Sequence, residues 1–132
     1  MNGKYLLDTN IVIALFAEDD SIQDRVNQAE EIFIPCIVIG ELYYGAYKSK
    51  NTKANLKKLG DFSAENVVLG IDMVTAKLYA EIKIKLQKIG ITIPENDVWI
   101  SAIAQVNQLI LVSRDEHFKE IKELKFGKLF LI

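Results

Sequence analysis

The sequence predicts an α/β fold, with a mostly parallel central sheet of four to five strands flanked by helices on both faces. Short apolar runs typical of buried strands alternate along the chain with longer stretches whose apolar residues recur at helical spacing. Parallel neighbours require such helical crossovers, because the chain must return to the same edge of the sheet before it enters the next strand. The 132 residues contain no internal repeat and no linker rich in proline, glycine or serine, so we expect a single domain over residues 1–132.

The first half of the chain begins with a strand and a capped helix. Residues 4–7 form a short apolar strand, and the polar residues Asp8, Thr9 and Asn10 that follow it cap a buried helix over residues 11–17. The next predicted elements are a helix, a strand and two further helices, over residues 21–31, 32–35, 37–47 and 51–62.

The second half continues the alternation. Residues 66–71 are the next predicted strand, and Gly90 ends the long helix that follows it. One face of that helix carries Val74, Leu78, Ile82, Leu86 and Ile89. Thr92 and Glu95 have the spacing of a capping box, which predicts a helix over residues 94–108. Beyond it we expect a strand over residues 109–112, a short helix and a last strand over residues 129–132.

The composition limits the kinds of site and location that are open to the chain. With one cysteine and one histidine there is no thiolate or imidazole cluster of the kind that binds zinc, so any metal must be held by oxygen. No apolar run approaches the roughly 20 residues that cross a bilayer. No secretory cleavage site follows the first apolar residues. We therefore expect a cytoplasmic protein with no membrane partner.

Two aspartates lie at the ends of predicted strands. Asp8 follows the strand over residues 4–7, and Asp115 lies just beyond the strand over residues 109–112. In open α/β sheets the ligand crevice lies beyond the carboxyl ends of the strands, so both side chains are expected to face one crevice. Each also has an ordinary structural interpretation. Asp8 can cap a helix, and Asp115 can be a turn residue or a carboxylate favoured by a helix dipole.

Glu41 and Asp97 are carboxylates on helix faces that also carry apolar residues. Glu41 shares its face with Val38 and Leu42, although an ionised carboxylate is costly to bury without a partner. Asp97 lies in the first turn of its helix and shares a face with Ile100, so it can point inward. The alternatives are a long-range salt bridge or a solvent-reaching position for Glu41, and simple helix-dipole complementarity for Asp97.

Taken together, the four carboxylates predict a shared divalent cation, Mg²⁺ or Mn²⁺, which offsets their mutual repulsion. Such a site suits phosphodiester hydrolysis, because a metal ion activates water and stabilises charge on the scissile phosphate and the leaving oxygen. The expected products carry 5′-phosphate and 3′-hydroxyl ends. The net charge of −2 does not exclude RNA, because the 18 acidic side chains less these four leave 14 against 16 basic ones.

Four short motifs carry a resemblance to a known family. They are LLDTN at residues 6–10, GELYYG at 40–45, PENDVWISA at 94–102 and SRDEHF at 113–118. In this order they resemble the PIN domain, and more narrowly toxins of the VapC type. In that family the acidic residues that match Asp8, Glu41, Asp97 and Asp115 form the catalytic metal site. The positions of Thr9 or Asn10 and of Ser113 support it by hydrogen bonds.

The resemblance also implies an activity and partners. It implies an endoribonuclease that cleaves structured RNA, such as tRNA or ribosomal RNA, as the toxin of a type II toxin–antitoxin module. The implied protein partners are a second copy of the chain, in a homodimer, and a small antitoxin whose tail occupies the acidic groove. Lysines just after the Glu41 helix, among them Lys48, Lys50 and Lys53, are candidates for phosphate contacts. Their alternative is a solvated helix face.

Three further features of the sequence bear on alternative functions. His117 is interpreted as a surface or turn residue. It is the only histidine, which excludes a two-histidine ribonuclease mechanism, and no Gly-x-Ser-x-Gly motif supports a Ser-His-Asp relay. A degenerate PIN fold that only binds protein or RNA is the main alternative function, and the complete set of four carboxylates argues against it. A phosphotransfer domain with Asp8 as nucleophile is disfavoured by Asn10, which stands where that chemistry needs a second aspartate.

Overall fold

The centre of the molecule is a five-stranded parallel sheet with the strand order β3-β2-β1-β4-β5. The computed structural model describes residues 3–127. The strands are β1 (Lys4–Leu7), β2 (Glu31–Pro35), β3 (Val67–Leu69), β4 (Ile110–Val112) and β5 (Phe126–Gly127). The predicted α/β class and parallel sheet are thus confirmed. The strand expected over residues 129–132 falls outside the described residues, whereas β5 was not predicted.

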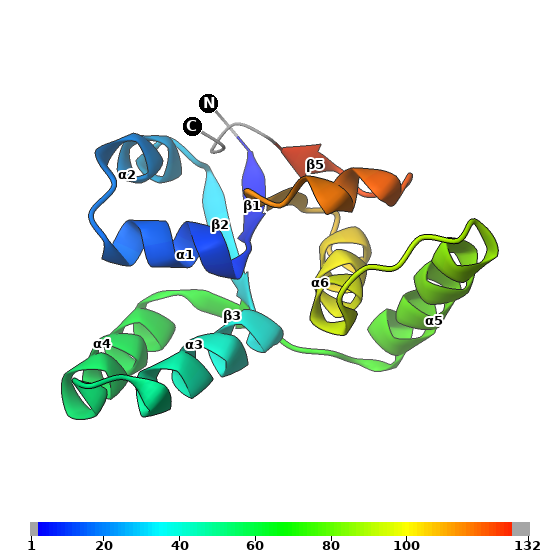
Figure 1. Cartoon of the computed structure of the whole chain (residues 1–132). Helices are drawn as coiled ribbons and strands as arrows, with labels where there is room; N and C mark the ends of the chain where they lie inside the picture. Colours follow the sequence, from blue (N-terminus) through cyan, green and yellow to red (C-terminus); the bar gives the residue numbers. More distant parts are fainter. Residues whose placement is uncertain (1–2, 128–132) are drawn as a thin grey trace.

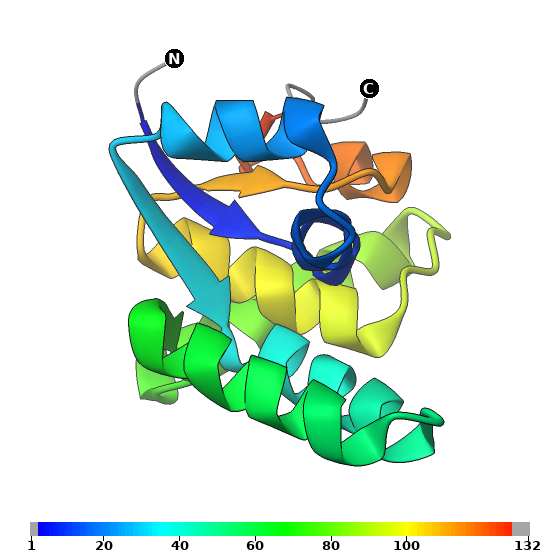
Figure 2. The same ribbon diagram turned by 90° about the vertical axis from the view of Figure 1, so that its left-hand side faces the viewer.

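Helices cover both faces of this sheet, as predicted (Figure 1). The chain contains α1 (Thr9–Phe16), α2 (Asp20–Asn27), α3 (Cys36–Lys48), α4 (Thr52–Glu65), α5 (Met73–Lys88), α6 (Glu95–Val106) and the short 3-10 helix η1 (Glu116–Glu120). Helices α1 and α2 lie on one side of the sheet, and α5 and α6 on the other (Figure 1). Helix α3 packs against α4 and also contacts α1 and α6, so it links the two layers. Figure 2 shows α3 and α4 together at one end of the molecule.

The core explains why the strands are continuous apolar runs. Tyr5, Leu6 and Leu7 of β1 are all buried, because the central strand of a sheet that helices cover on both faces has no solvent side. Helix α6 is the most buried helix, with Val98 and every residue from Ile100 to Ala104 in the interior. None of the described helices is long and apolar enough to cross a membrane.

Of the two predictions for the loop between α5 and α6, one is confirmed and one is wrong. Gly90 lies just after α5 with a φ of +73°, a conformation that glycine adopts without steric cost, so the predicted end of that helix is confirmed. The predicted capping box is wrong. Helix α6 starts after Pro94 without a side-chain cap, and the Glu95 carboxylate instead pairs with Lys83 of α5 at 2.6 Å.

The strand order places a crevice beside β1. From β1 the chain moves to β2 on one side, while β4 lies on the other side, so the order reverses between β1 and β4. Ligands of open α/β sheets bind beyond the carboxyl ends of the strands at such a point. The backbone N–H of Asp8 donates to the carbonyl of Val112 at 3.0 Å, which holds the two strand ends together there.

Candidate metal centre

A cleft of about 490 Å³, which we call the acidic cleft, lies beyond the carboxyl ends of β1 and β4. It is lined by Asp8, Thr9, Asn10, Ile13, Glu41, Pro94, Glu95, Asn96, Asp97 and Asp115. All four carboxylates singled out in the sequence therefore face one space. They come from four places: the end of β1, the middle of α3, the first turn of α6 and the segment after β4.

Asp8 is the most enclosed of the four, with 3% of its surface exposed. It caps α1, accepting a hydrogen bond from the Thr9 N–H at 2.8 Å, and its other oxygen accepts one from the Ser113 hydroxyl at 2.6 Å. Burial raises the pKa of the Asp8 carboxyl, and these two hydrogen bonds act against that rise. Asp8 therefore both caps α1 and lines the acidic cleft.

Asn10 and Ser113 connect Asp8 to Asp115. The side-chain amide of Asn10 lies 3.2 Å from the Ser113 hydroxyl, 3.3 Å from Asp115 Oδ2 and 3.4 Å from Asp8 Oδ2. In return, the Arg114 N–H donates to Asn10 Oδ1 at 3.1 Å, and the Asp115 N–H donates to Ser113 Oγ at 3.0 Å. This network fixes the segment after β4 against the turn after β1, so the two aspartates keep one relative position.

Glu41 is half-buried on α3, between the buried residues Val38 and Leu42. Within residues 3–127 it forms no salt bridge, which removes one of its two structural alternatives. Burial raises the pKa of Glu41, and the neighbouring Asp8 charge raises it further. The Thr9 hydroxyl faces this carboxylate and partly opposes the rise in its pKa, yet it is buried without a hydrogen bond of normal geometry.

Asp97 contacts His117, which the sequence did not mark as part of the site. His117 Nε2 lies 2.8 Å from Asp97 Oδ2, and the side chains are 33% and 14% exposed, respectively. Burial and then the Asp8 charge raise the pKa of Asp97, whereas His117 lowers it. The interpretation of His117 as an ordinary surface or turn residue missed this contact. Its position two residues after Asp115 was the signal that could have revealed it.

The candidate RNA-binding lysines do not line the acidic cleft. Lys48, Lys50 and Lys53 are exposed at the connection between α3 and α4. Lys58 of α4 lies nearer, because it lines a groove of about 280 Å³ that shares Thr9, Ile13 and Glu41 with the acidic cleft. Contact of the three named lysines with RNA stays a prediction.

The donor set of the acidic cleft fits a hard divalent cation. Carboxylate oxygens are the ligands that Mg²⁺ and Mn²⁺ prefer. Within residues 3–127, none of the four carboxylates pairs with a lysine or arginine. The unsatisfied Thr9 hydroxyl gives a further oxygen at the same wall.

Comparisons with known proteins agree with this arrangement. The family model described as the PIN domain matches residues 5–124. The chain belongs to the PIN-domain family. Among its PIN-domain relatives, ribonuclease VapC2 of Haemophilus influenzae is 40% identical over 114 residues, which cover 85% of this chain and 86% of that relative. The tRNA(fMet)-specific endonuclease VapC of Shigella flexneri is 30% identical over 114 residues, with the same coverage of 85% and 86%.

A solved structure extends the similarity to three dimensions. VapBC2 from Rickettsia felis, determined in complex with a DNA fragment from its promoter, contains a chain that superposes with a TM-score of 0.85 at 30% identity. The match covers 94% of this chain and 97% of that one. The predicted resemblance to VapC-type PIN domains is thus confirmed at the level of both sequence and fold.

Proposed function

We propose that this PIN domain is a metal-dependent endoribonuclease, the toxin component of a type II toxin–antitoxin module. The observation that carries the proposal is the convergence of Asp8, Glu41, Asp97 and Asp115 in one cleft without cationic partners from lysine or arginine among the described residues. Relatives named as ribonucleases share the fold and cover most of the chain. A degenerate, purely binding PIN fold would have no need to hold these charges together.

In this proposal the four carboxylates hold Mg²⁺ or Mn²⁺. When bound, the cation lowers the pKa of a water molecule and neutralises charge that develops on the scissile phosphate. Neighbouring residues of the chain hold these carboxylates in position and orient them. Ser113 and Asn10 keep the Asp8 carboxylate turned into the cleft, and the Thr9 N–H prevents its rotation. The products are expected to carry 5′-phosphate and 3′-hydroxyl ends.

The substrate that we propose is structured RNA, such as tRNA or ribosomal RNA. The acidic cleft is open to solvent, and all of its lining residues except Ile13 and Pro94 carry polar or charged side chains. It therefore offers polar groups to a phosphodiester of a folded RNA. Phosphates outside the cleft would be contacted by lysines of α3 and α4, including Lys48, Lys50 and Lys53. Each such contact makes the affinity for RNA dependent on salt.

We also propose two protein partners and a location. A cognate antitoxin would occupy the acidic cleft with its tail. A second copy of the chain would cover exposed apolar side chains that include Tyr44, Tyr47, Met73 and Val74. An RNase toxin and its antitoxin act where cellular RNA lies, so the proposed location is the cytoplasm.

The experiment that tests the proposed activity is cleavage of total cellular RNA by purified protein freed of antitoxin. We expect discrete fragments with 5′-phosphate ends in Mg²⁺ or Mn²⁺, and none in EDTA or with Asp8→Asn or Asp97→Asn. Asp61→Asn is the matched control, because it changes an exposed carboxylate that pairs with Lys57 on α4, outside the cleft. If folded, metal-loaded protein cleaves nothing, the binding-module interpretation replaces ours.

A further inference from the structure

His117 places a nitrogen donor beside the acidic cleft, next to two of the carboxylates that line it. One potential ligand atom from each of Asp97, Asp115 and His117 lies within 4.8 Å of the other two. In the structure, His117 Nε2 lies 2.8 Å from Asp97 Oδ2. Donor atoms at these separations can converge on one cation with small side-chain rotations.

The imidazole is held in place from both ends of its segment. The next residue, Phe118, is fully buried, and its ring centroid lies 4.7 Å from that of His117. On the other side, the Asp115 N–H is tied to the buried Ser113 hydroxyl. Asp97 is fixed on α6, where its backbone carbonyl accepts a hydrogen bond from the Ser101 hydroxyl at 2.8 Å. The three side chains therefore project from backbone that is already ordered.

We propose that Asp97, Asp115 and His117 form a mixed nitrogen and oxygen seat that binds Mn²⁺ in preference to Mg²⁺. The proposal rests on the metal dependence of the proposed function and adds a ligand and a metal preference to it. Both ions favour carboxylate oxygen. Mg²⁺ also demands near-ideal octahedral geometry and gives up its waters reluctantly, whereas Mn²⁺, as a transition-metal ion, accepts an imidazole nitrogen more readily than Mg²⁺ does. The sequence analysis expected only oxygen ligands. In this proposal His117 supplies a nitrogen ligand beside Asp97 and Asp115, and Asp8 and Glu41 supply oxygen alone.

A different role for His117 would be to orient Asp97 by a hydrogen bond without touching the metal. The two roles separate in the variant His117→Gln. A glutamine amide can still donate a hydrogen bond to Asp97, but it is a poor ligand for transition metals. A residue that only orients Asp97 would therefore be replaced by glutamine with little change in metal preference.

The first measurement is pulsed electron paramagnetic resonance of the Mn²⁺-loaded protein. The chain has one histidine, so in protein without a histidine tag a coordinated imidazole can only be His117. We expect nitrogen modulation from a directly bound imidazole in the wild type and its loss in His117→Gln. A Mn²⁺ signal without this modulation would overturn the seat while leaving the metal-dependent nuclease intact.

The second measurement compares Mn²⁺ and Mg²⁺ affinities by calorimetric titration. We expect His117→Gln to reduce the ratio of Mn²⁺ to Mg²⁺ affinity by about tenfold or more. Glu116→Gln, one residue earlier in the same segment, is expected to leave the ratio unchanged, and circular dichroism checks the fold of both variants. An unchanged ratio in His117→Gln would overturn the proposal. Failure of the wild type to bind either ion would instead overturn the metal dependence of the proposed function.

Discussion

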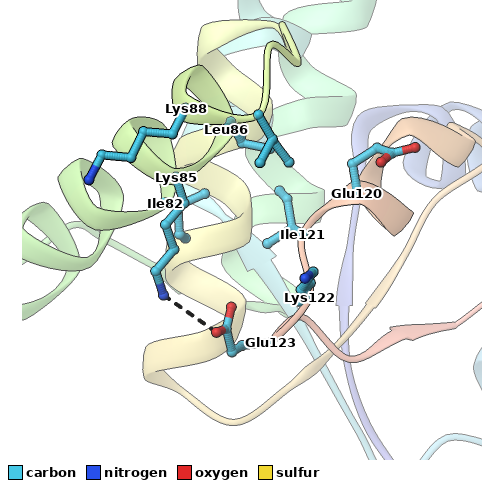
Figure 3. A pocket seen from close by; sticks show the side chains of 9 residues that line it. Ile82, Lys85, Leu86, Lys88, Glu120, Ile121, Lys122 and Glu123 are labelled. Atoms are coloured by element: carbon cyan, nitrogen blue, oxygen red, sulfur yellow. Dashed lines mark hydrogen bonds and ion pairs between the residues drawn. The ribbon is translucent and has the colours of Figure 1, made fainter.

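The acidic cleft and another cleft of the molecule handle charge in opposite ways. The second one, which we call the apolar cleft, has about 380 Å³ and lies between α5 and the segment after η1 (Figure 3). Ile82, Leu86 and Ile121 line it, and the charged side chains beside them are exposed. Two of these charges form an ion pair, with Lys85 Nζ 3.4 Å from a Glu123 oxygen. In the acidic cleft, burial raises the pKa of three of the four carboxylates.

The comparison distinguishes burial that stabilises the fold, in the apolar cleft, from burial that costs stability, in the acidic cleft. Burial of apolar side chains such as Ile121 stabilises the folded state. Burial of carboxylates without lysine or arginine partners destabilises it, because burial penalises their charged form. A fold that keeps such carboxylates together indicates a function at that place. The apolar cleft is better explained as packing between α5 and the segment that leads to β5.

The largest expected effect is on cleavage. Asp97→Asn should lower the cleavage rate by more than about a hundredfold, because it removes one charge from the proposed metal ligands. Ile121→Ala, in the apolar cleft, should leave the rate per folded molecule unchanged. Rates are measured on a defined RNA fragment found by end-sequencing. Equal losses in the two variants would remove the functional distinction between the clefts.

On stability the order of the two clefts reverses. Ile121 is 5% exposed, and Ile121→Ala should lower the free energy of unfolding by about 2–5 kcal/mol, because it removes buried methyl groups and leaves a cavity. Urea unfolding followed by circular dichroism measures this loss. Asp97→Asn in EDTA serves as the comparison and should show no such loss. A loss below about 1 kcal/mol in Ile121→Ala would show that the apolar cleft collapses around the smaller side chain.

Ser113→Ala should produce a smaller loss of cleavage than Asp97→Asn. The hydroxyl of Ser113 donates to Asp8 and accepts from the Asp115 N–H, so its removal loosens two proposed ligands without removing either. Loss of such supporting hydrogen bonds lowers metal affinity or activity by about 10–100-fold. The matched control is Ser63→Ala, since the Ser63 hydroxyl on α4 is buried without a hydrogen-bond partner among the described residues. If Ser113→Ala is as active as the control, the hydrogen bond from Ser113 is not needed to position Asp8.

The sequence was most informative where local rules decide the structure. Alternating apolar runs placed β1 to β4 and the six long helices within a few residues of their positions. The positions of Asp8 and Asp115 at strand ends were enough to predict that they face one crevice. These predictions succeed because a parallel sheet brings its strand ends to one edge whatever the details of packing.

Tertiary contacts account for what the sequence did not reveal. His117 contacts Asp97 across 20 positions, from η1 to α6. The proximity of His117 to Asp115 in the sequence places it near the cleft but does not reveal Asp97 as its partner. The capping box failed because α6 begins at Glu95 with Pro94 at its N-cap, so Thr92 lies outside the capping position, and Glu95 pairs with Lys83 of α5. Strand β5 is two residues long, too short for its periodicity to be recognised.

The smallest expected effect is on the stability of the metal-free protein. It compares how a buried charge in the acidic cleft and an exposed charge at the apolar cleft affect stability. Asp8 has a raised pKa in the folded state, so its contribution to stability is greatest below its unfolded pKa and is lost as the pH rises through the folded value. Asp8→Asn removes this penalty and keeps one oxygen for the α1 cap, because asparagine caps helices about as well as aspartate. Its amide nitrogen replaces the oxygen that accepts from Ser113, so the hydrogen bond from the Ser113 hydroxyl is lost.

In EDTA, therefore, the variant should be more stable than the wild type at neutral pH, and its advantage should shrink as the pH falls toward 4. The measurement is the thermal midpoint at several pH values, with Glu123→Gln at the mouth of the apolar cleft as the control. That exposed pair contributes little, so its removal should change the midpoint slightly and without this trend. A wild type that stays more stable than Asp8→Asn at neutral pH would mean that the hydrogen bonds from Ser113 and Thr9 outweigh the burial of the Asp8 charge. The acidic cleft would then be stabilising, like the apolar one.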